Sequence, residues 1–108
     1  MNTTHDTIER IKKAIADNSI MLFMKGTPMF PQCGFSSQVV RILDTCGVKY
    51  GHINVLEEQD VRQELPKYAN WPTFPQLYVN GQLIGGCDIV TEMYEAGELQ
   101  QLLAPFKG

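Results

Sequence analysis

The sequence has no excess of basic residues and no long hydrophobic run. Its 108 residues include 9 Lys or Arg and 12 Asp or Glu, so the net charge is −3. No basic patch stands out, and binding to nucleic acid or to a membrane surface is therefore not expected. The longest apolar run is far shorter than the ~18 residues of a membrane span. Residues 1–6 also lack the basic and apolar regions of a signal peptide.

Cysteine is scarce as well. The chain has three cysteines, Cys33, Cys46 and Cys87, an odd number without the spacing of a disulfide framework. Free thiols are typical of a reducing compartment, which favours a cytoplasmic location. The sequence also lacks a glycine-rich phosphate loop, a paired-carboxylate site and zinc-ligand spacing, so none of these three kinds of site is expected.

The length and the hydrophobic content of 44% predict a single domain over residues 1–108. Periodicity and turn signals then divide the chain into helices and strands. The expected elements are a helix over 6–17, a strand over 20–24 buried on both faces, a helix leading from Phe35 to Gly47, a strand over 50–56, a helix over 59–68, strands over 76–79 and 82–84, a helix opened by Cys87 and Asp88, and a helix over 98–103.

Several residues mark the ends of these elements. Asp6 with Glu9 is similar to a capping box, and Asp88 is a candidate N-cap. Asn80-Gly81 between apolar segments predicts a type I′ hairpin turn. In the helix after Asp88, Ile89 and Met93 are expected to face the core.

This order of elements predicts an α/β fold. The first two strands are separated by a helix, and such a crossover makes them parallel. The last two strands form a hairpin. The result is a mixed four-stranded sheet with helices on both faces.

The loop over residues 25–37 carries the most distinctive chemistry. Cys33 lies where this loop is expected to meet the start of a helix. The unpaired N–H groups and the dipole at a helix N-terminus favour an anion, so this position lowers the pKa of a thiol. Lys25 adds positive charge. Ser36 stands where a C-x-x-C motif would have its second cysteine, and its hydroxyl can donate a hydrogen bond to a thiolate but cannot close a disulfide.

The other two cysteines differ in their relation to Cys33. Cys46 lies 13 residues further along the same predicted helix, roughly 20 Å away at ~1.5 Å per residue. A disulfide needs Cα atoms closer than ~7 Å, so that pairing is excluded if the helix is correct. Cys46 is interpreted as a small buried residue. Cys87 is expected at the same end of the sheet as Cys33. It is a packed or capping residue, a backbone contact for a ligand, or a slow resolving thiol.

Four sequence blocks, in order and with their spacing preserved, resemble those of monothiol (CGFS-type) glutaredoxins. They are Lys25-Gly26-Thr27-Pro28, Pro31-x-Cys33-Gly34-Phe35-Ser36, Trp71-Pro72-Thr73-Phe74-Pro75-Gln76 and Gly85-Gly86-Cys87-Asp88. The resemblance covers nearly the whole chain and is closest to short, single-domain bacterial members. It implies the glutaredoxin form of the thioredoxin fold.

The resemblance also implies a cofactor and partners. In that family the cysteine at position 33 binds a [2Fe–2S] cluster together with glutathione. Such a cluster takes four thiolates, so two protomers and two glutathione molecules would complete the set. The implied role is storage of the cluster and its delivery to apo iron–sulfur proteins. The implied assemblies are a homodimer bridged by the cluster and heterodimers with BolA-like proteins.

Candidate positions for glutathione follow from the same blocks. Lys25 and Arg62 are expected to bind the glycine carboxylate. The backbone of Thr73 and Phe74, which precede a cis Pro75, is expected to bind the cysteinyl part. The γ-glutamyl end is assigned to the helix start at Gly86, Cys87 and Asp88. Each charged residue also has a purely structural interpretation as a solvated side chain or helix cap. Trp71 is interpreted as a packing residue, and Phe35 as either a core anchor or an exposed interface residue.

Two other functions remain open. A single thiol of low pKa can reduce a protein–glutathione mixed disulfide, with a second glutathione completing the cycle. Compared with dithiol glutaredoxins, residues 26–30 form an insert before Pro31, and only weak reductase activity is expected. The second alternative is an interaction module that docks on a partner through the face around Cys33.

Overall fold

The computed structural model describes residues 3–107. Its elements follow the expected order. They are α1 (Thr3–Asp17), β1 (Ile20–Met24), α2 (Gly34–Cys46), β2 (Gly51–Asn54), α3 (Gln59–Ala69), β3 (Gln76–Val79), β4 (Gln82–Gly85), α4 (Cys87–Glu95), α5 (Glu98–Leu103) and a 3₁₀ turn (Ala104–Phe106) that the sequence pattern did not indicate.

The four strands form one mixed sheet in the order β2-β1-β3-β4. β1 is parallel to β2, as the helical crossover through α2 requires, and antiparallel to β3. β3 and β4 form the antiparallel hairpin. The hairpin turn has Asn80 at φ 51° and Gly81 at φ 80°, the two positive angles of a type I′ turn. The predicted sheet is therefore confirmed.

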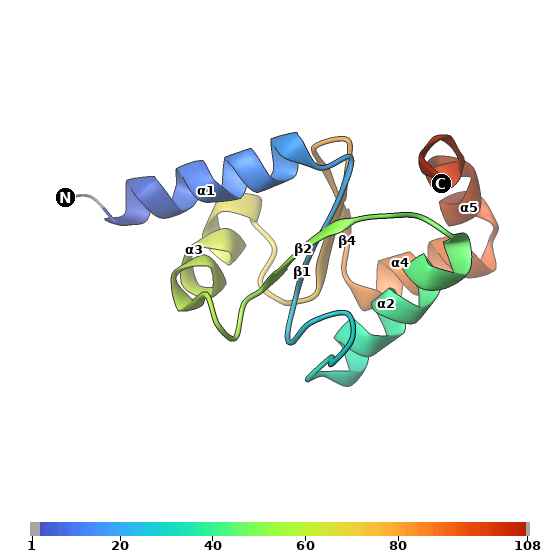
Figure 1. Cartoon of the computed structure of the whole chain (residues 1–108), viewed down its shortest axis with the longest axis horizontal. Helices are drawn as coiled ribbons and strands as arrows, with labels where there is room; N and C mark the ends of the chain where they lie inside the picture. The colour runs from blue at the N-terminus through green and yellow to red at the C-terminus, as the bar shows by residue number, and fades with distance from the viewer. Residues whose placement is uncertain (1–2, 108) are drawn as a thin grey trace.

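Helices cover both faces of this sheet (Figure 1). α1 and α3 lie on one face, where they pack on Met21, Phe23 and Tyr78. α2, α4 and α5 lie on the other face, where Ile20 and Leu22 belong to a second apolar cluster. All five residues of β1 are buried, because alternate side chains of a strand point to opposite faces.

Some boundaries differ from the expected ones. Asp6 does not cap α1, because the helix already includes Thr3 and Asp6 lies within its first turns. Asp88 does not cap α4: the carbonyl of Gly86 accepts the Val90 N–H at 3.0 Å, so the helical hydrogen bonds begin at Gly86. The strand predicted over 50–56 is shorter at both ends. Among the described residues, no helix combines the length and the apolar character that a membrane crossing requires.

The loop between β1 and α2 turns back on itself at Gly26. The Gln32 N–H donates to the Lys25 carbonyl at 2.9 Å, and Thr27 and Phe30 exchange backbone hydrogen bonds at 3.0 and 3.2 Å. Gly26 has φ 94°, a left-handed conformation that residues with a Cβ rarely adopt. A Cβ there would lie 2.5 Å from the Gln32 nitrogen and 2.6 Å from the Phe30 oxygen. The loop therefore requires glycine at this position.

We expect Gly26→Ala to destabilise the fold, since the left-handed conformation alone costs about 1–2 kcal/mol and both clashes are with backbone. Gly34→Ala is the matched control, because a Cβ at Gly34 meets nothing within 4 Å. Chemical unfolding of both variants measures the difference. Equal free energies of unfolding for the two variants would contradict this account of the loop.

Candidate functional site

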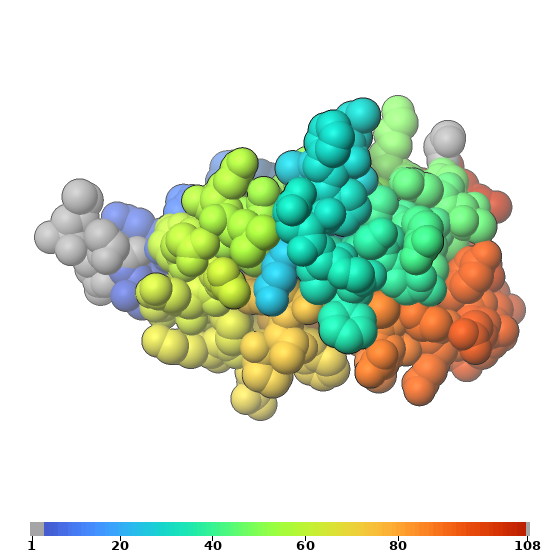
Figure 2. Space-filling view, turned by 90° about the horizontal axis from the view of Figure 1, so that it is seen from below, coloured from blue at the N-terminus to red at the C-terminus, as the bar shows by residue number. Residues whose placement is uncertain are grey.

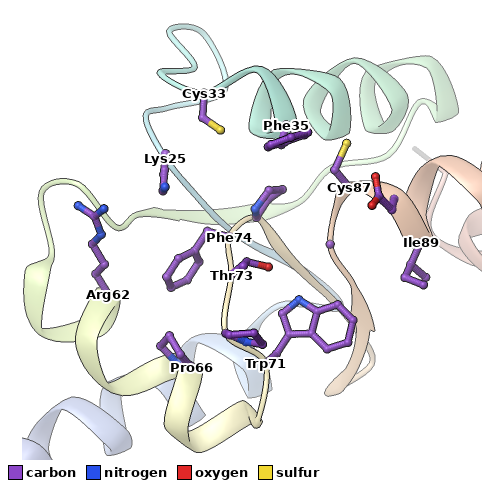
Figure 3. A pocket seen from close by; sticks show the side chains of 14 residues that line it. Lys25, Cys33, Phe35, Arg62, Pro66, Trp71, Thr73, Phe74, Cys87 and Ile89 are labelled. Carbon is purple, nitrogen blue, oxygen red and sulfur yellow. The ribbon is translucent and has the colours of Figure 1, made fainter.

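A pocket of about 520 Å³ opens at the end of the sheet where β1 stops and β3 begins. All nine residues that the sequence predicted for the site line it: Lys25, Cys33, Arg62, Thr73, Phe74, Pro75, Gly86, Cys87 and Asp88. They come from the loop after β1, the segment before β3, Gly86 and the start of α4, and from α3 (Figure 3). Figure 2 views the molecule from this side, where the loop before α2 lies beside α3 and the chain that leads into β3. The structure brings these residues together, while their roles stay predictions.

Cys33 occupies the N-cap position of α2, in extended conformation with φ −149° and ψ 134°. Its carbonyl accepts the first helical hydrogen bond, from the Ser37 N–H at 2.9 Å. The backbone N–H of Ser36 is the main cause that lowers the pKa of the Cys33 thiol. Partial burial raises this pKa, while the Phe35 N–H, the charge of Lys25 and the Ser36 hydroxyl lower it further. Cys33 is therefore an activated thiol at a helix N-terminus, as predicted.

Two polar side chains hold the loop that carries Lys25. Ser36 is fully buried, and its hydroxyl accepts a hydrogen bond from the Lys25 N–H at 3.1 Å. The side-chain oxygen of Asn54, at the end of β2, accepts from the Gly26 N–H at 2.9 Å and from the Leu56 N–H at 3.0 Å. The end of β1, the start of α2 and the end of β2 are thereby tied together. Asn54 carried no local signal that sequence reasoning used.

Opposite charges lie at different walls of the pocket. Lys25 and Arg62 lie on one side of Phe74, whereas Cys87 and Ile89 lie on the other (Figure 3). Asp88 stands in the first turn of α4, and the N–H groups of that turn have no partner within the helix itself. One wall of the pocket therefore has two cationic side chains that can bind an anion. The other wall has backbone N–H donors and the carboxylate of Asp88.

The structure corrects one expectation about an apolar side chain and decides between the two alternatives for another. Ile89 was expected in the core, but it is 37% exposed and lines the pocket, while the neighbouring Val90 takes the buried position. Phe35 is 62% exposed, which excludes a role as a core anchor. Trp71 was interpreted as a packing residue, and it also lines the pocket. Its position in the Trp-Pro block beside Thr73 was the signal that could have placed it there.

The other thiols are placed as the sequence suggested. Cys46 is buried in the core near the end of α2, and its burial raises the pKa of that thiol. Cys87 is half-buried at the start of α4, and its sulfur lies 3.9 Å from the Thr91 hydroxyl. All three cysteines are free thiols.

Comparison with known proteins identifies the family of this chain. The sequence model of the Glutaredoxin family matches residues 20–84. The chain belongs to the glutaredoxin family. It is 60% identical over 97 residues to glutaredoxin 4 of Escherichia coli K12, a match covering 90% of this chain and 84% of that protein. Glutaredoxin 4 of Pasteurella multocida is 56% identical over 99 residues, or 92% of this chain and 91% of that protein.

Solved glutaredoxin structures agree with this fold. The solution structure of reduced apo GrxS14 from poplar has a TM-score of 0.79 at 46% identity and covers 91% of this chain and 90% of that one. The crystal structure of a buckwheat glutaredoxin–glutathione complex has a TM-score of 0.83 at 26% identity, over 94% of this chain and 91% of that one. This glutaredoxin thus has the thioredoxin-like architecture expected from its sequence, and it is similar to bacterial glutaredoxin 4 proteins.

The lowered pKa of Cys33 predicts how its alkylation by iodoacetamide depends on pH. Only the thiolate reacts, so the midpoint for Cys33 should lie below the pKa of an ordinary cysteine thiol, about 8.5. Lys25→Gln should move this midpoint upward, because it removes a cation that favours the thiolate. Lys49→Gln, a change of an exposed lysine outside the pocket, is the control. Peptide mass spectrometry follows each cysteine separately. A Cys33 midpoint at or above the ordinary value of about 8.5 would contradict the proposed activation.

Proposed function

We propose that this chain is a monothiol glutaredoxin that binds glutathione and carries a [2Fe–2S] cluster between two protomers for delivery to apo iron–sulfur proteins. The observation that carries the proposal is the position of Cys33, an activated thiol at the mouth of a pocket with cations at one wall and a helix N-terminus at the other. The cluster is the cargo in this proposal, and Cys33 is its protein ligand.

The chemistry of the pocket matches glutathione. That tripeptide has a carboxylate at each end and one ammonium group, beside the γ-glutamyl carboxylate. Lys25 and Arg62 would bind the glycine carboxylate. The first turn of α4, with Cys87 and Asp88, would bind the γ-glutamyl end. The volume of about 520 Å³ is within the range of small-molecule sites, roughly 300–1,000 Å³. The complex of the buckwheat relative with glutathione supports glutathione as the ligand.

The number of thiolates supports a shared cluster. A [2Fe–2S] cluster is held by four ligands, typically thiolates, and this chain places one activated thiol at the pocket. Among residues 3–107, no three His, Cys, Asp or Glu side chains are grouped so that they could hold a metal ion. Two protomers and two glutathione thiols would supply four sulfur ligands. A cluster held partly by diffusible ligands would also be released readily to an acceptor.

The surface next to Cys33 fits a face that a second chain covers. Met29 is 82%, Phe30 70% and Phe35 62% exposed, and all three are within four residues of Cys33. Clustered apolar side chains at a surface mark interaction sites. A second protomer is the occupant in the homodimer, and a BolA-like protein is the occupant in a heterodimer. The cytoplasmic location stays a prediction that three free thiols favour.

Reduction of mixed disulfides is the second candidate, because the same thiol is a nucleophile. The Cys33 thiolate would attack the glutathione sulfur of a protein–glutathione disulfide and release the protein thiolate. A second glutathione thiolate would then attack the Cys33–glutathione disulfide, giving oxidised glutathione and restoring the Cys33 thiolate. A docking module without any cluster is the third candidate.

Anaerobic reconstitution with iron and sulfide tests the cluster proposal. We expect a coloured dimer only when glutathione is present, and none with Cys33→Ser, because that variant removes the sole protein ligand. Cys46→Ala is the control, since Cys46 is buried away from the pocket. Visible absorption and light scattering are recorded on the same sample. A full-strength cluster on Cys33→Ser would overturn the proposal, and a colourless monomer of the unchanged chain would leave the reductase and docking candidates.

The proposed role of Arg62 predicts a selective loss of glutathione affinity. Arg62→Gln removes a cation at the pocket wall, and a hydrogen bond to a charged group is worth enough to weaken binding about tenfold. The difference should shrink at high salt, because Arg62 is exposed and its charge is screened. Arg41→Gln, on the exposed face of α2, should bind as the unchanged chain does. Calorimetric titration with glutathione measures all three, and equal affinities for the Arg62 and Arg41 variants would contradict the assignment.

A further inference from the structure

Gln76 is a fully buried polar residue directly behind the pocket wall. It is the first residue of β3, is 0% exposed, and pairs with Phe23 of the central strand β1. It does not line the pocket itself. A buried amide that is left without partners is costly, so the hydrogen bonds of Gln76 indicate what holds it there.

The Gln76 side chain binds the chain segment that precedes it. Its amide nitrogen donates to the Trp71 carbonyl at 3.0 Å and to the Thr73 carbonyl at 3.3 Å. Its amide oxygen accepts a hydrogen bond from the Tyr78 hydroxyl at 2.9 Å. Both N–H donors and the oxygen are therefore used. The two carbonyl partners also fix which end of the amide is the nitrogen, because a carbonyl can only accept.

The segment over residues 71–75 has few donors of its own. Pro72 and Pro75 have no N–H group. The segment is attached to α3 by the Trp71 N–H, which donates to the Pro66 carbonyl at 3.1 Å. The Gln76 amide is a second attachment, between that point and the start of β3. All five residues of the segment line the pocket, so its shape is the shape of one pocket wall.

Tyr78 in turn fixes the Gln76 amide. The Tyr78 ring packs edge-on against Phe23, with ring centroids 5.6 Å apart and an interplanar angle of 78°. The side chain is buried, and this burial raises the pKa of the hydroxyl to about 12. Its proton is therefore retained at physiological pH, and the donor to Gln76 is always present.

We propose that Gln76, oriented by Tyr78, is a positioning residue that sets the ligand-binding conformation of the pocket wall formed by residues 71–75. Because Thr73 and Phe74 belong to this wall, the amide controls affinity for a ligand that it never touches. The choice of glutathione as that ligand rests on the proposed function; the attachment of the wall by Gln76 does not.

Gln76→Glu tests the proposal with almost no change in shape. Once ionised, the introduced carboxylate has no proton to donate and faces two carbonyl oxygens, so at alkaline pH glutathione affinity should fall about tenfold. As the pH falls the carboxyl binds a proton, and burial moves this step to higher pH. One donor is then restored, so the ratio of unchanged to variant affinity should decrease toward pH 5.5. Gln82→Glu, the same change at the exposed first residue of β4, should keep a ratio near one throughout.

Trp71 provides a measurement that needs no ligand. It is the single tryptophan of the chain and lies in the wall, so its emission reports the conformation of that segment. In Gln76→Glu at alkaline pH we expect a red-shifted emission and stronger quenching by acrylamide, both reversed at pH 5.5. Tyr78→Phe removes only the hydroxyl that orients the amide and should give a smaller effect in the same direction, and Tyr68→Phe, an exposed tyrosine of α3, should give none.

The outcomes separate this inference from the proposed function. If the unchanged chain binds glutathione and Gln76→Glu binds it equally well, the inference is wrong. A loss of affinity by the same factor at every pH would also overturn it, because protonation of the introduced carboxyl should restore one donor to the wall. If the unchanged chain does not bind glutathione, the proposed function fails, and the emission of Trp71 decides the inference. Unchanged emission and quenching in both Gln76→Glu and Tyr78→Phe would overturn it.

Discussion

Burial of β1 on both faces is the constraint on which the rest of the molecule depends. Its five residues are apolar without interruption, and the strand divides the core into two clusters. The helices of each face pack on alternate residues of this one strand, and β2 and β3 pair with its two edges. The chain leaves β1 at Met24, so the loop with Lys25 and Cys33 has a fixed point of departure at one edge of the sheet. A reactive thiol on a loop gains its position from this rigid strand.

Uncharged polar side chains then shape the pocket. Ser36, Asn54 and Gln76 each bind backbone groups of a loop that the strands alone do not hold. A hydroxyl or an amide satisfies such groups at little electrostatic cost, whereas a buried charge would require a partner of its own. The charged residues Lys25, Arg62 and Asp88 remain at the pocket surface, where they are open to a ligand. Rigid neutral supports and accessible charges are thus separate parts of the same site.

The sequence predicted the elements and the members of the site better than it predicted their supports. The continuous apolar run of β1, the Asn80-Gly81 turn and Gly47 at the end of α2 are local signals with direct physical causes, and each is confirmed. In α4 the cap was misplaced by two positions, at Asp88 instead of the extended Gly86, and the buried residue by one position, at Ile89 instead of Val90. A shift of one residue turns a helix by about 100°, which exchanges Ile89 for Val90 in the core.

The supports were missed for a different reason. Asn54 binds the Gly26 N–H 28 residues away, whereas Gln76 binds carbonyls three and five residues before it. In both cases an amide side chain carries no sequence pattern that reveals which backbone groups it binds. The four blocks of resemblance located Cys33 and its surroundings, because each block is a short continuous stretch of sequence and all four contribute residues to the pocket. Contacts that join separate elements depend on the register of the sheet, which a one-dimensional pattern leaves open.

The proposed ligand set has a consequence for loading that follows from mass action. A cluster held by two protomers and two glutathione thiols forms with the square of the free protein concentration and the square of the free glutathione concentration, so occupancy below saturation depends steeply on both. The single activated thiol of Cys33 is the reason for this dependence, since one protomer cannot complete the set. The exposed apolar residues Met29, Phe30 and Phe35 would lower the cost of bringing the second protomer into place. A carrier built this way would load where glutathione is abundant and would release its cluster once an acceptor with a complete ligand set competes for it.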